Sequence, residues 1–152
     1  MKPIKPLFFL AALCMLMAVS CKKSGNKPQT ATVSMTFKFN GTAETSKLVV
    51  ATYYKSQSTV QIAGSYGTSA LDLSIENIKT GTFDLATDPT ILATFSTAPD
   101  FNHTYIGTTG KVVITAFTSD TVAGTLEFSG TDGLSEPGAV TEGTFSAKLI
   151  TQ

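Results

Sequence analysis

Residues 33–41 read Val-Ser-Met-Thr-Phe-Lys-Phe-Asn-Gly, and this stretch decides the fold class. Apolar side chains alternate with polar ones up to Phe39, which is the pattern of a β-strand with one buried face. Asn40-Gly41 follows, and this dipeptide favours a tight hairpin because both residues tolerate positive φ. We therefore predict a strand that ends in a two-residue turn with positive φ at Gly41.

Similar short runs of apolar and polar residues recur along the rest of the chain, separated by Gly or Pro. No segment beyond the N-terminal region shows a sustained helical period. This spacing predicts an all-β fold, a single antiparallel β-sandwich or partly closed β-barrel of about nine strands. The further predicted strands are Leu48–Tyr54, Thr59–Tyr66, Leu71–Ile75, Phe83–Leu85, Ile91–Phe95, Tyr105–Ile106, Lys111–Thr118, Val122–Ser129 and Gly143–Ile150.

The N-terminus has the organisation of a secretory signal peptide. Two lysines precede the apolar run Leu7–Val19, which is shorter than the roughly 20 residues that a membrane-spanning helix needs. Residues 18–21, Ala-Val-Ser-Cys, resemble the bacterial lipobox, which implies acyl chains such as palmitate on Cys21. We divide the chain into a signal peptide (1–20), a flexible tether (21–31) and an all-β domain (32–152). Because lysine follows Cys21 where an inner-membrane retention signal has aspartate, we expect anchoring in the outer membrane, on either face.

Composition narrows the possible functions. The chain has no arginine, and residues 32–152 contain 6 lysines against 11 acidic residues, a formal net charge of −5. Nucleic-acid binding is therefore not expected, because it relies on basic surfaces. Once Cys21 is lipidated, the mature chain has no thiol left for a disulfide or a catalytic nucleophile. We expect no cofactor and a monomeric protein.

Candidate chemical groups are sparse. His103 is the only histidine, no nucleophile motif accompanies it, and we interpret it as a loop residue. The acidic loop Asp132–Glu136 could offer oxygens to calcium, but such loops are mostly solvated. Asp72 and Glu76 could suggest a glycosidase pair, yet four residues along one strand separate them by about 13 Å. We assign no catalytic, metal or cofactor residue, and enzymatic activity stays undecided but not favoured.

Two weaker patterns concern a possible modification and a possible ligand. Residues 120–122, Asp-Thr-Val, resemble a three-residue motif for periplasmic O-glycosylation, with Thr121 as the acceptor, in a turn where a glycan would disturb the fold least. Tyr53 and Tyr54 must point to opposite faces of a strand, so at most one belongs to the core of a single sheet. Exposed tyrosines could stack on sugars, and a carbohydrate or protein partner stays open.

Four segments together resemble a family of small bacterial envelope lipoproteins of unknown function with an all-β domain. They are Phe37–Gly41, Gly110–Thr115, Val122–Phe128 and Val140–Phe145, which correspond in order to F-x-N-G, G-x-V-x-I-T, I-x-G-T-F-x-F and V-x-x-G-T-F. Members usually have a tryptophan after the first Asn-Gly, and this chain has none. The resemblance supports the fold, and for the function we expect a lipid-anchored, non-catalytic binding or structural module of the cell envelope. The alternatives are a small glycan hydrolase with paired carboxylates and a barrel that encloses an apolar ligand.

Overall fold

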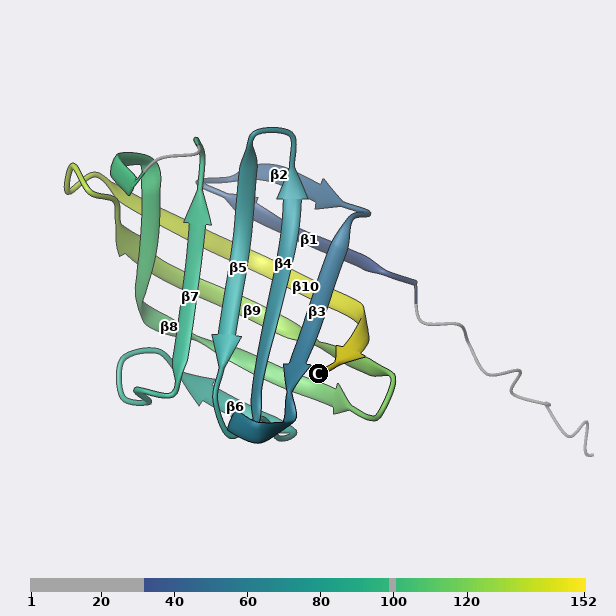
Figure 1. The fold of residues 1–152 in the computed structure, drawn as a ribbon. Coiled ribbons are helices and arrows are strands. Elements are labelled where there is room, and N and C mark those ends of the chain that lie inside the picture. The colour runs from purple at the N-terminus through teal and green to yellow at the C-terminus, as the bar shows by residue number, and fades with distance from the viewer. Residues whose placement is uncertain (1–31, 99–100) are drawn as a thin grey trace, which may run out of the picture.

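The computed structural model describes residues 32–98 and 101–152 (Figure 1). The predicted signal peptide, the tether and Cys21 lie outside the described residues. The described chain forms ten strands and two short 3-10 turns, which confirms the all-β prediction, and no helix in these two ranges has the length and apolar character to cross a membrane. The strands are β1 (Ser34–Phe39), β2 (Thr42–Ser46), β3 (Val49–Tyr54), β4 (Thr59–Tyr66), β5 (Ser69–Ile75), β6 (Gly81–Asp84), β7 (Ile91–Ser96), β8 (Thr104–Phe117), β9 (Thr121–Thr131) and β10 (Pro137–Thr151).

Seven of these strands close into a barrel. The ring runs β3-β4-β5-β7-β8-β9-β10 and returns from β10 to β3. Every pairing in it is antiparallel except the last, in which Leu149–Thr151 of β10 lie parallel to Ala51–Tyr53 of β3. β1 and β2 extend the sheet from the other part of β10, and β6 extends it from β8. The sequence pattern did not distinguish a sandwich from a barrel. The three parallel residue pairs between β10 and β3 show that the sheet closes into a ring.

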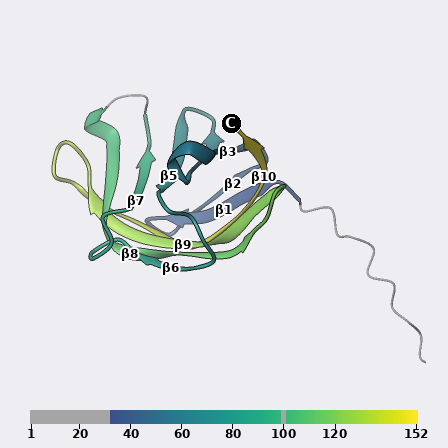
Figure 2. The ribbon, with the colours of Figure 1, turned by 60° about the horizontal axis from the view of Figure 1, so that its bottom comes forward.

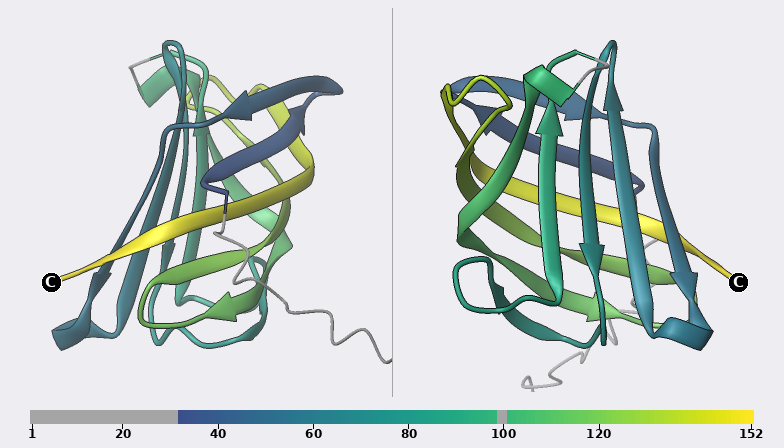
Figure 3. Two further views of the ribbon diagram at one scale, coloured as in Figure 1. Left: turned by 90° about the vertical axis from the view of Figure 1, so that its right-hand side faces the viewer. Right: turned by 60° about the vertical axis from the view of Figure 1, so that its left-hand side comes forward.

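The barrel is flattened into two layers that we call the front layer and the back layer. The front layer consists of β3, β4, β5 and β7, and the back layer of β1, β10, β9 and β8, whose strands cross those of the front layer steeply in Figure 1. Figures 2 and 3 show the same two layers from the end and from the sides. β8 belongs to both layers, because its first residues pair with β7 and the remainder pairs with β9.

Apolar side chains fill the space between the layers. Phe95 is 1% exposed and forms the centre of an aromatic group, with ring centroids 5.2 Å from Phe37 and 4.6 Å from Phe39. Close packing of this kind makes the interior dense and stabilises the fold through burial. Other side chains with at most 1% exposure include Met35, Val60, Ile62, Leu71, Leu73, Ile75, Val112, Ile114, Val122 and Val140.

The first predicted turn is confirmed in detail. Asn40 and Gly41 have φ of 46° and 84°, and Phe39 pairs with Thr42 across the two-residue loop. The strand that follows the turn, β2, was missed because residues 42–46 are mostly exposed and carry no apolar alternation. The predicted strands Tyr105–Ile106 and Lys111–Thr118 fall in one long strand, β8, which continues through a bulge near Gly107 and ends one residue before Thr118.

Candidate functional site

The outward-facing residues of the front layer form a continuous surface. Cross-strand register aligns Val50 with Ala63, Ala63 with Asp72, and Asp72 with Thr94. The residues between them along each strand, such as Ala51, Ile62 and Leu73, are buried in the core, so the aligned set must point to solvent. We call this surface the Asp72 face and define it by Leu48, Val50, Thr52, Gln61, Ala63, Asp72, Ser74, Leu92, Thr94, Ile106 and Ile150.

Large apolar side chains gather on the Asp72 face. In the described part of the chain, five of the six large hydrophobic residues that are exposed belong to it, with Leu48 at 67% and Leu92 at 50%. The sixth, Leu134, lies between β9 and β10. Ile150 joins the face because it pairs with Thr52, and Ile106 because it pairs with Thr94. Clustered exposure of this kind marks an interaction surface more often than scattered single residues do.

A shallow groove of about 300 Å³ crosses the middle of the Asp72 face. Ala63, Ser74 and Thr94 have short side chains at its centre, whereas Val50 and Leu92 are longer apolar residues along it. The groove therefore combines apolar flanks with a small number of polar groups, the composition that many binding sites share.

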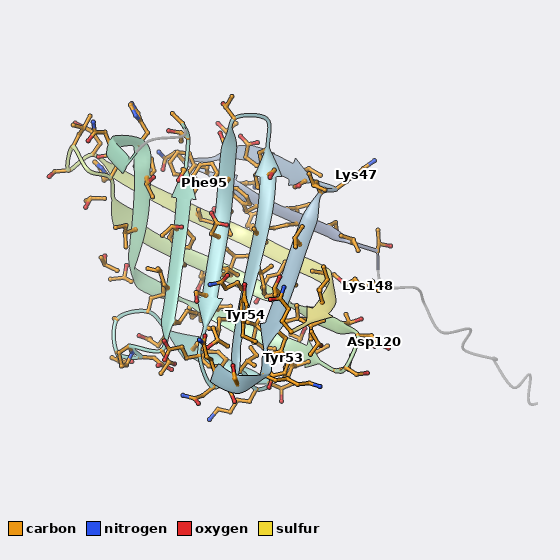
Figure 4. All side chains as sticks on the ribbon, viewed as in Figure 1. Lys47, Tyr53, Tyr54, Phe95, Asp120 and Lys148 are labelled. Atoms are coloured by element: carbon orange, nitrogen blue, oxygen red, sulfur yellow. The ribbon has the colours of Figure 1, made fainter. Side chains whose placement is uncertain are left out.

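Asp72 is the only charged residue in the set that defines the face. Its carboxylate has no hydrogen bond or ion pair with any residue that the structure describes. The residue is exposed to solvent, but its surroundings remove part of its hydration, and this loss raises the pKa of the Asp72 carboxyl above its usual value. Figure 4 shows the labelled charged residues Lys47, Asp120 and Lys148 away from the centre of this layer.

The outer face of the back layer has the opposite character. Its charged side chains are paired, Lys38 with Glu142 at 2.7 Å and Lys111 with Glu127 at 3.2 Å. Threonine hydroxyls also meet across strands, as in the 2.9 Å contact between Thr36 and Thr144. These contacts between charges and between hydroxyls suit a surface that faces water.

The structure does not bring the two candidate acids together. Asp72 lies within β5, and Glu76 follows the end of that strand, where its backbone N–H donates to Thr90 at 2.8 Å. A second carboxylate near Asp72 would raise the pKa of Asp72 further by charge repulsion, and no described residue contributes in that way. The geometry therefore offers a single carboxylate in this groove.

Other predicted positions have structural surroundings. His103 ends a 3-10 turn, and its backbone carbonyl accepts a hydrogen bond from the Thr97 N–H at 3.0 Å. Asp132 is 9% exposed, and its Oδ1 accepts the backbone N–H groups of Leu134 and Glu136, both at 2.9 Å. That carboxylate therefore stabilises the hairpin between β9 and β10. Over residues 32–98 and 101–152, no group of three His, Cys, Asp or Glu could hold a metal.

Three further predicted positions lie at strand ends. Thr121 is the half-buried first residue of β9, and its backbone N–H donates to Thr118 Oγ1 at 3.1 Å. Asp120 beside it is exposed, so the turn of the glycosylation motif is at the surface, and modification of Thr121 stays a prediction. Tyr53 meets the ring of Phe117 edge to face at 5.3 Å, while Tyr54 lies on the opposite face of β3, as the alternation predicted.

The strands that carry the Asp72 face also carry a family signature. The sequence model of a family described as "Domain of unknown function (DUF6252)" matches residues 45–147, which is most of the chain. The chain belongs to this family. The DUF6252 region covers the whole of β3 to β9 and ends in β10, just before the residues that close the barrel. No curated protein and no solved structure matches the chain.

Proposed function

We propose that this protein is a lipid-anchored, non-catalytic binding module of the bacterial cell envelope, with the Asp72 face as its binding surface. The observation that carries the proposal is the gathering of exposed aliphatic side chains around one unpaired carboxylate on a single sheet face. Depletion of charge together with apolar clustering is typical of the core of a protein interface.

The exposed aliphatic residues have no role within the fold that would explain them. The buried side chains of the same strands, such as Ile62, Leu73 and Phe95, already supply the core. Side chains on the outer face could be polar without loss of packing, as many are on the back layer. A partner that covers Val50, Leu92 and their neighbours would explain why they are apolar.

The proposal of a lipid anchor rests on the sequence. Cys21 would carry the acyl chains, and residues 22–31 would connect it to the first strand. Ten extended residues reach about 33 Å at roughly 3.3 Å each, so the domain would work within a few tens of ångströms of the bilayer. Stable anchoring needs more than one acyl chain, which lipidation at a lipobox cysteine provides. O-glycosylation at Thr121 belongs to the same envelope proposal.

The two alternative functions lack a supporting observation of their own. A retaining or inverting glycosidase needs two carboxyl groups at a set separation, and the groove has one. A carrier of an apolar ligand needs interior space, and side chains fill the interior of the described barrel. The binding proposal explains the exposed aliphatic residues of the Asp72 face, which both alternatives leave unexplained.

Thiol labelling in cells tests whether the Asp72 face is occupied. Thr94→Cys places a reactive thiol in the groove, and Thr125→Cys places a matched thiol on the exposed back layer. The native Cys21 would be blocked by lipid. If a partner covers the face, maleimide should label the Thr94→Cys variant at least about fivefold more slowly in intact envelopes than after purification. The Thr125→Cys variant should show no such difference, and equal rates for both variants would refute a binding role for this face.

Metabolic labelling tests the anchor separately. An alkyne analogue of palmitate should enter the wild-type protein and not the Cys21→Ser variant. That variant should also leave the membrane fraction and become soluble in the periplasm. If the Cys21→Ser variant still takes up the label, the acyl chain is attached to another residue and the anchor proposal is wrong.

A further inference from the structure

We infer that the partner of the Asp72 face is a protein that inserts a lysine or arginine side chain, surrounded by aliphatic residues, into the groove at Asp72. This inference rests on the proposed function and adds the chemistry of the partner. It follows from the charge on the face, from its polar groups and from the shape of the groove.

The charge on the face is uncompensated. Asp72 has lost part of its hydration and has no cationic neighbour among the described residues. A partner that covered this carboxylate with apolar groups alone would remove the remaining water and strand the charge, which is strongly unfavourable. A cationic side chain would replace the lost water with an ion pair. The net charge of −5 over residues 32–152 adds long-range attraction for a basic partner.

The polar groups beside Asp72 suit a cation with several donors. Thr52, Gln61 and Ser74 line the same groove and offer hydroxyl and amide oxygens as acceptors. Within the described residues, these three side chains make no hydrogen bond. An ammonium or guanidinium group carries three to five N–H donors, so one carboxylate alone would not satisfy it. The groove supplies both the charge and the additional acceptors.

The apolar flanks indicate a protein as the source of that cation. Val50 and Leu92 border the groove, and Leu48, Ile106 and Ile150 lie further out on the same face. Such an arrangement matches an interface in which a charged pair is enclosed by aliphatic contacts that exclude water. The stem of a lysine or arginine is itself apolar and would pack against these flanks.

Other occupants fit less well. Sugars are held by stacking on aromatic rings in many sites; Tyr54 at the end of β3 points to the same side as Val50 and Thr52, but neither it nor any other aromatic residue lines the groove. A second copy of this chain would bring two Asp72 carboxylates and two domains of charge −5 together. A membrane with anionic headgroups would be repelled by the same carboxylate. These three occupants therefore become outcomes of the test.

Photo-crosslinking in the producing cells tests the inference on the full-length chain. A photoreactive amino acid such as p-benzoylphenylalanine replaces Thr94 in the groove, and Thr125 on the back layer in the control. We expect one discrete protein adduct from position 94 and none of that size from position 125. Mass spectrometry of the adduct should place the linked segment next to a surface lysine or arginine with aliphatic neighbours.

Charge variants then test whether the negative charge of Asp72 contributes to binding of the partner. Asp72→Lys should reduce the yield of the adduct at least about tenfold, and Asp72→Asn should reduce it less. Glu136→Lys makes the same change of charge in the hairpin between β9 and β10 and should leave the yield unchanged. Circular dichroism of each purified variant verifies that the fold is retained, and Asp72→Asn keeps the test valid if the lysine variant does not fold.

The possible failures are distinguishable. Absence of any adduct at position 94 would overturn the proposed binding function together with this inference. An adduct with a glycan, with lipid or with a second copy of the chain would keep a binding function and overturn the class of partner. A protein adduct whose yield is insensitive to both Asp72 variants would overturn the cationic contact alone.

Discussion

The front and back layers of this barrel are built from the same strand pattern but present different surfaces to water. On the back layer, two lysines are paired with glutamates and the hydroxyls of Thr36 and Thr144 contact one another. On the front layer, aliphatic side chains surround one carboxylate with no partner in the described chain. Both layers bury the same kind of core, so the requirements of folding do not explain the difference. This comparison supports the proposal that a partner covers the front layer.

The largest loss of stability should come from substitution of a glycine in the back layer. A Cβ atom at Gly110 would lie 2.2 Å from the backbone oxygen of Glu127, and the residue has φ of 112°. Gly110→Ala should therefore lower the free energy of unfolding by more than about 3 kcal/mol or prevent folding, because rigid backbone must move. Urea denaturation followed by circular dichroism measures this change.

Gly64 in β4 is the matched control for the front layer. A Cβ atom there would meet the sulfur of Met35 at 2.9 Å and the Tyr66 hydroxyl at 3.0 Å, and both groups belong to side chains that can shift. Gly64→Ala should cost clearly less than Gly110→Ala in the same denaturation experiment. Equal losses would show that close backbone approach does not distinguish the two layers.

A smaller effect is expected at the hairpin that extends the back layer beyond the barrel. Gly41 has φ of 84° but open space around its Cβ position, so only backbone strain opposes a side chain there. Gly41→Val should reduce the free energy of unfolding by roughly 1–2 kcal/mol. Gly41→Asn should cost less, because asparagine tolerates positive φ. An unchanged denaturation midpoint for the valine variant would contradict the strain argument.

The smallest effect should be a gain in stability at Asp72. Its pKa is raised in the folded state, so folding is favoured when the carboxyl is protonated and opposed once the pH exceeds that raised value. Asp72→Asn should therefore raise Tm at pH 7 by a fraction of the ~3 °C that 1 kcal/mol produces in a domain of this size. The gain should disappear as the pH falls through the range in which Asp72 becomes protonated.

Glu127→Gln is the matched control on the back layer. Glu127 is exposed and paired with Lys111, and loss of a surface ion pair costs about 0–1 kcal/mol. At pH 7 this variant should therefore be equal to or slightly less stable than the wild type. Differential scanning calorimetry of both variants over a series of pH values makes the comparison. A loss of stability at pH 7 in Asp72→Asn would remove the distinction between the layers.

Local sequence signals predicted the strands and the first turn, but not the arrangement that creates the site. Alternation over residues 33–39 and the Asn40-Gly41 pair act within a few residues, and the structure confirms both. β2 escaped prediction because a mostly exposed strand needs no apolar side. Within the predicted strand Leu71–Ile75, Asp72 alternates with buried apolar residues and is exposed to solvent. Its alignment with Ala63 and Thr94 depends on the register of three strands, which a single sequence does not reveal.

The three parallel pairs between β10 and β3 determine when the fold can be completed. Leu149–Thr151 reach Ala51–Tyr53 across nearly a hundred residues, and β1 likewise has its partner in β10. A chain synthesised from its N-terminus must therefore keep its first strands without these neighbours until the last strand has emerged. Such long-range pairing slows folding, because loop closure precedes the gain from contact. Early intermediates would expose unpaired strand edges, so this topology makes the protein dependent on rapid completion or on protection by a chaperone.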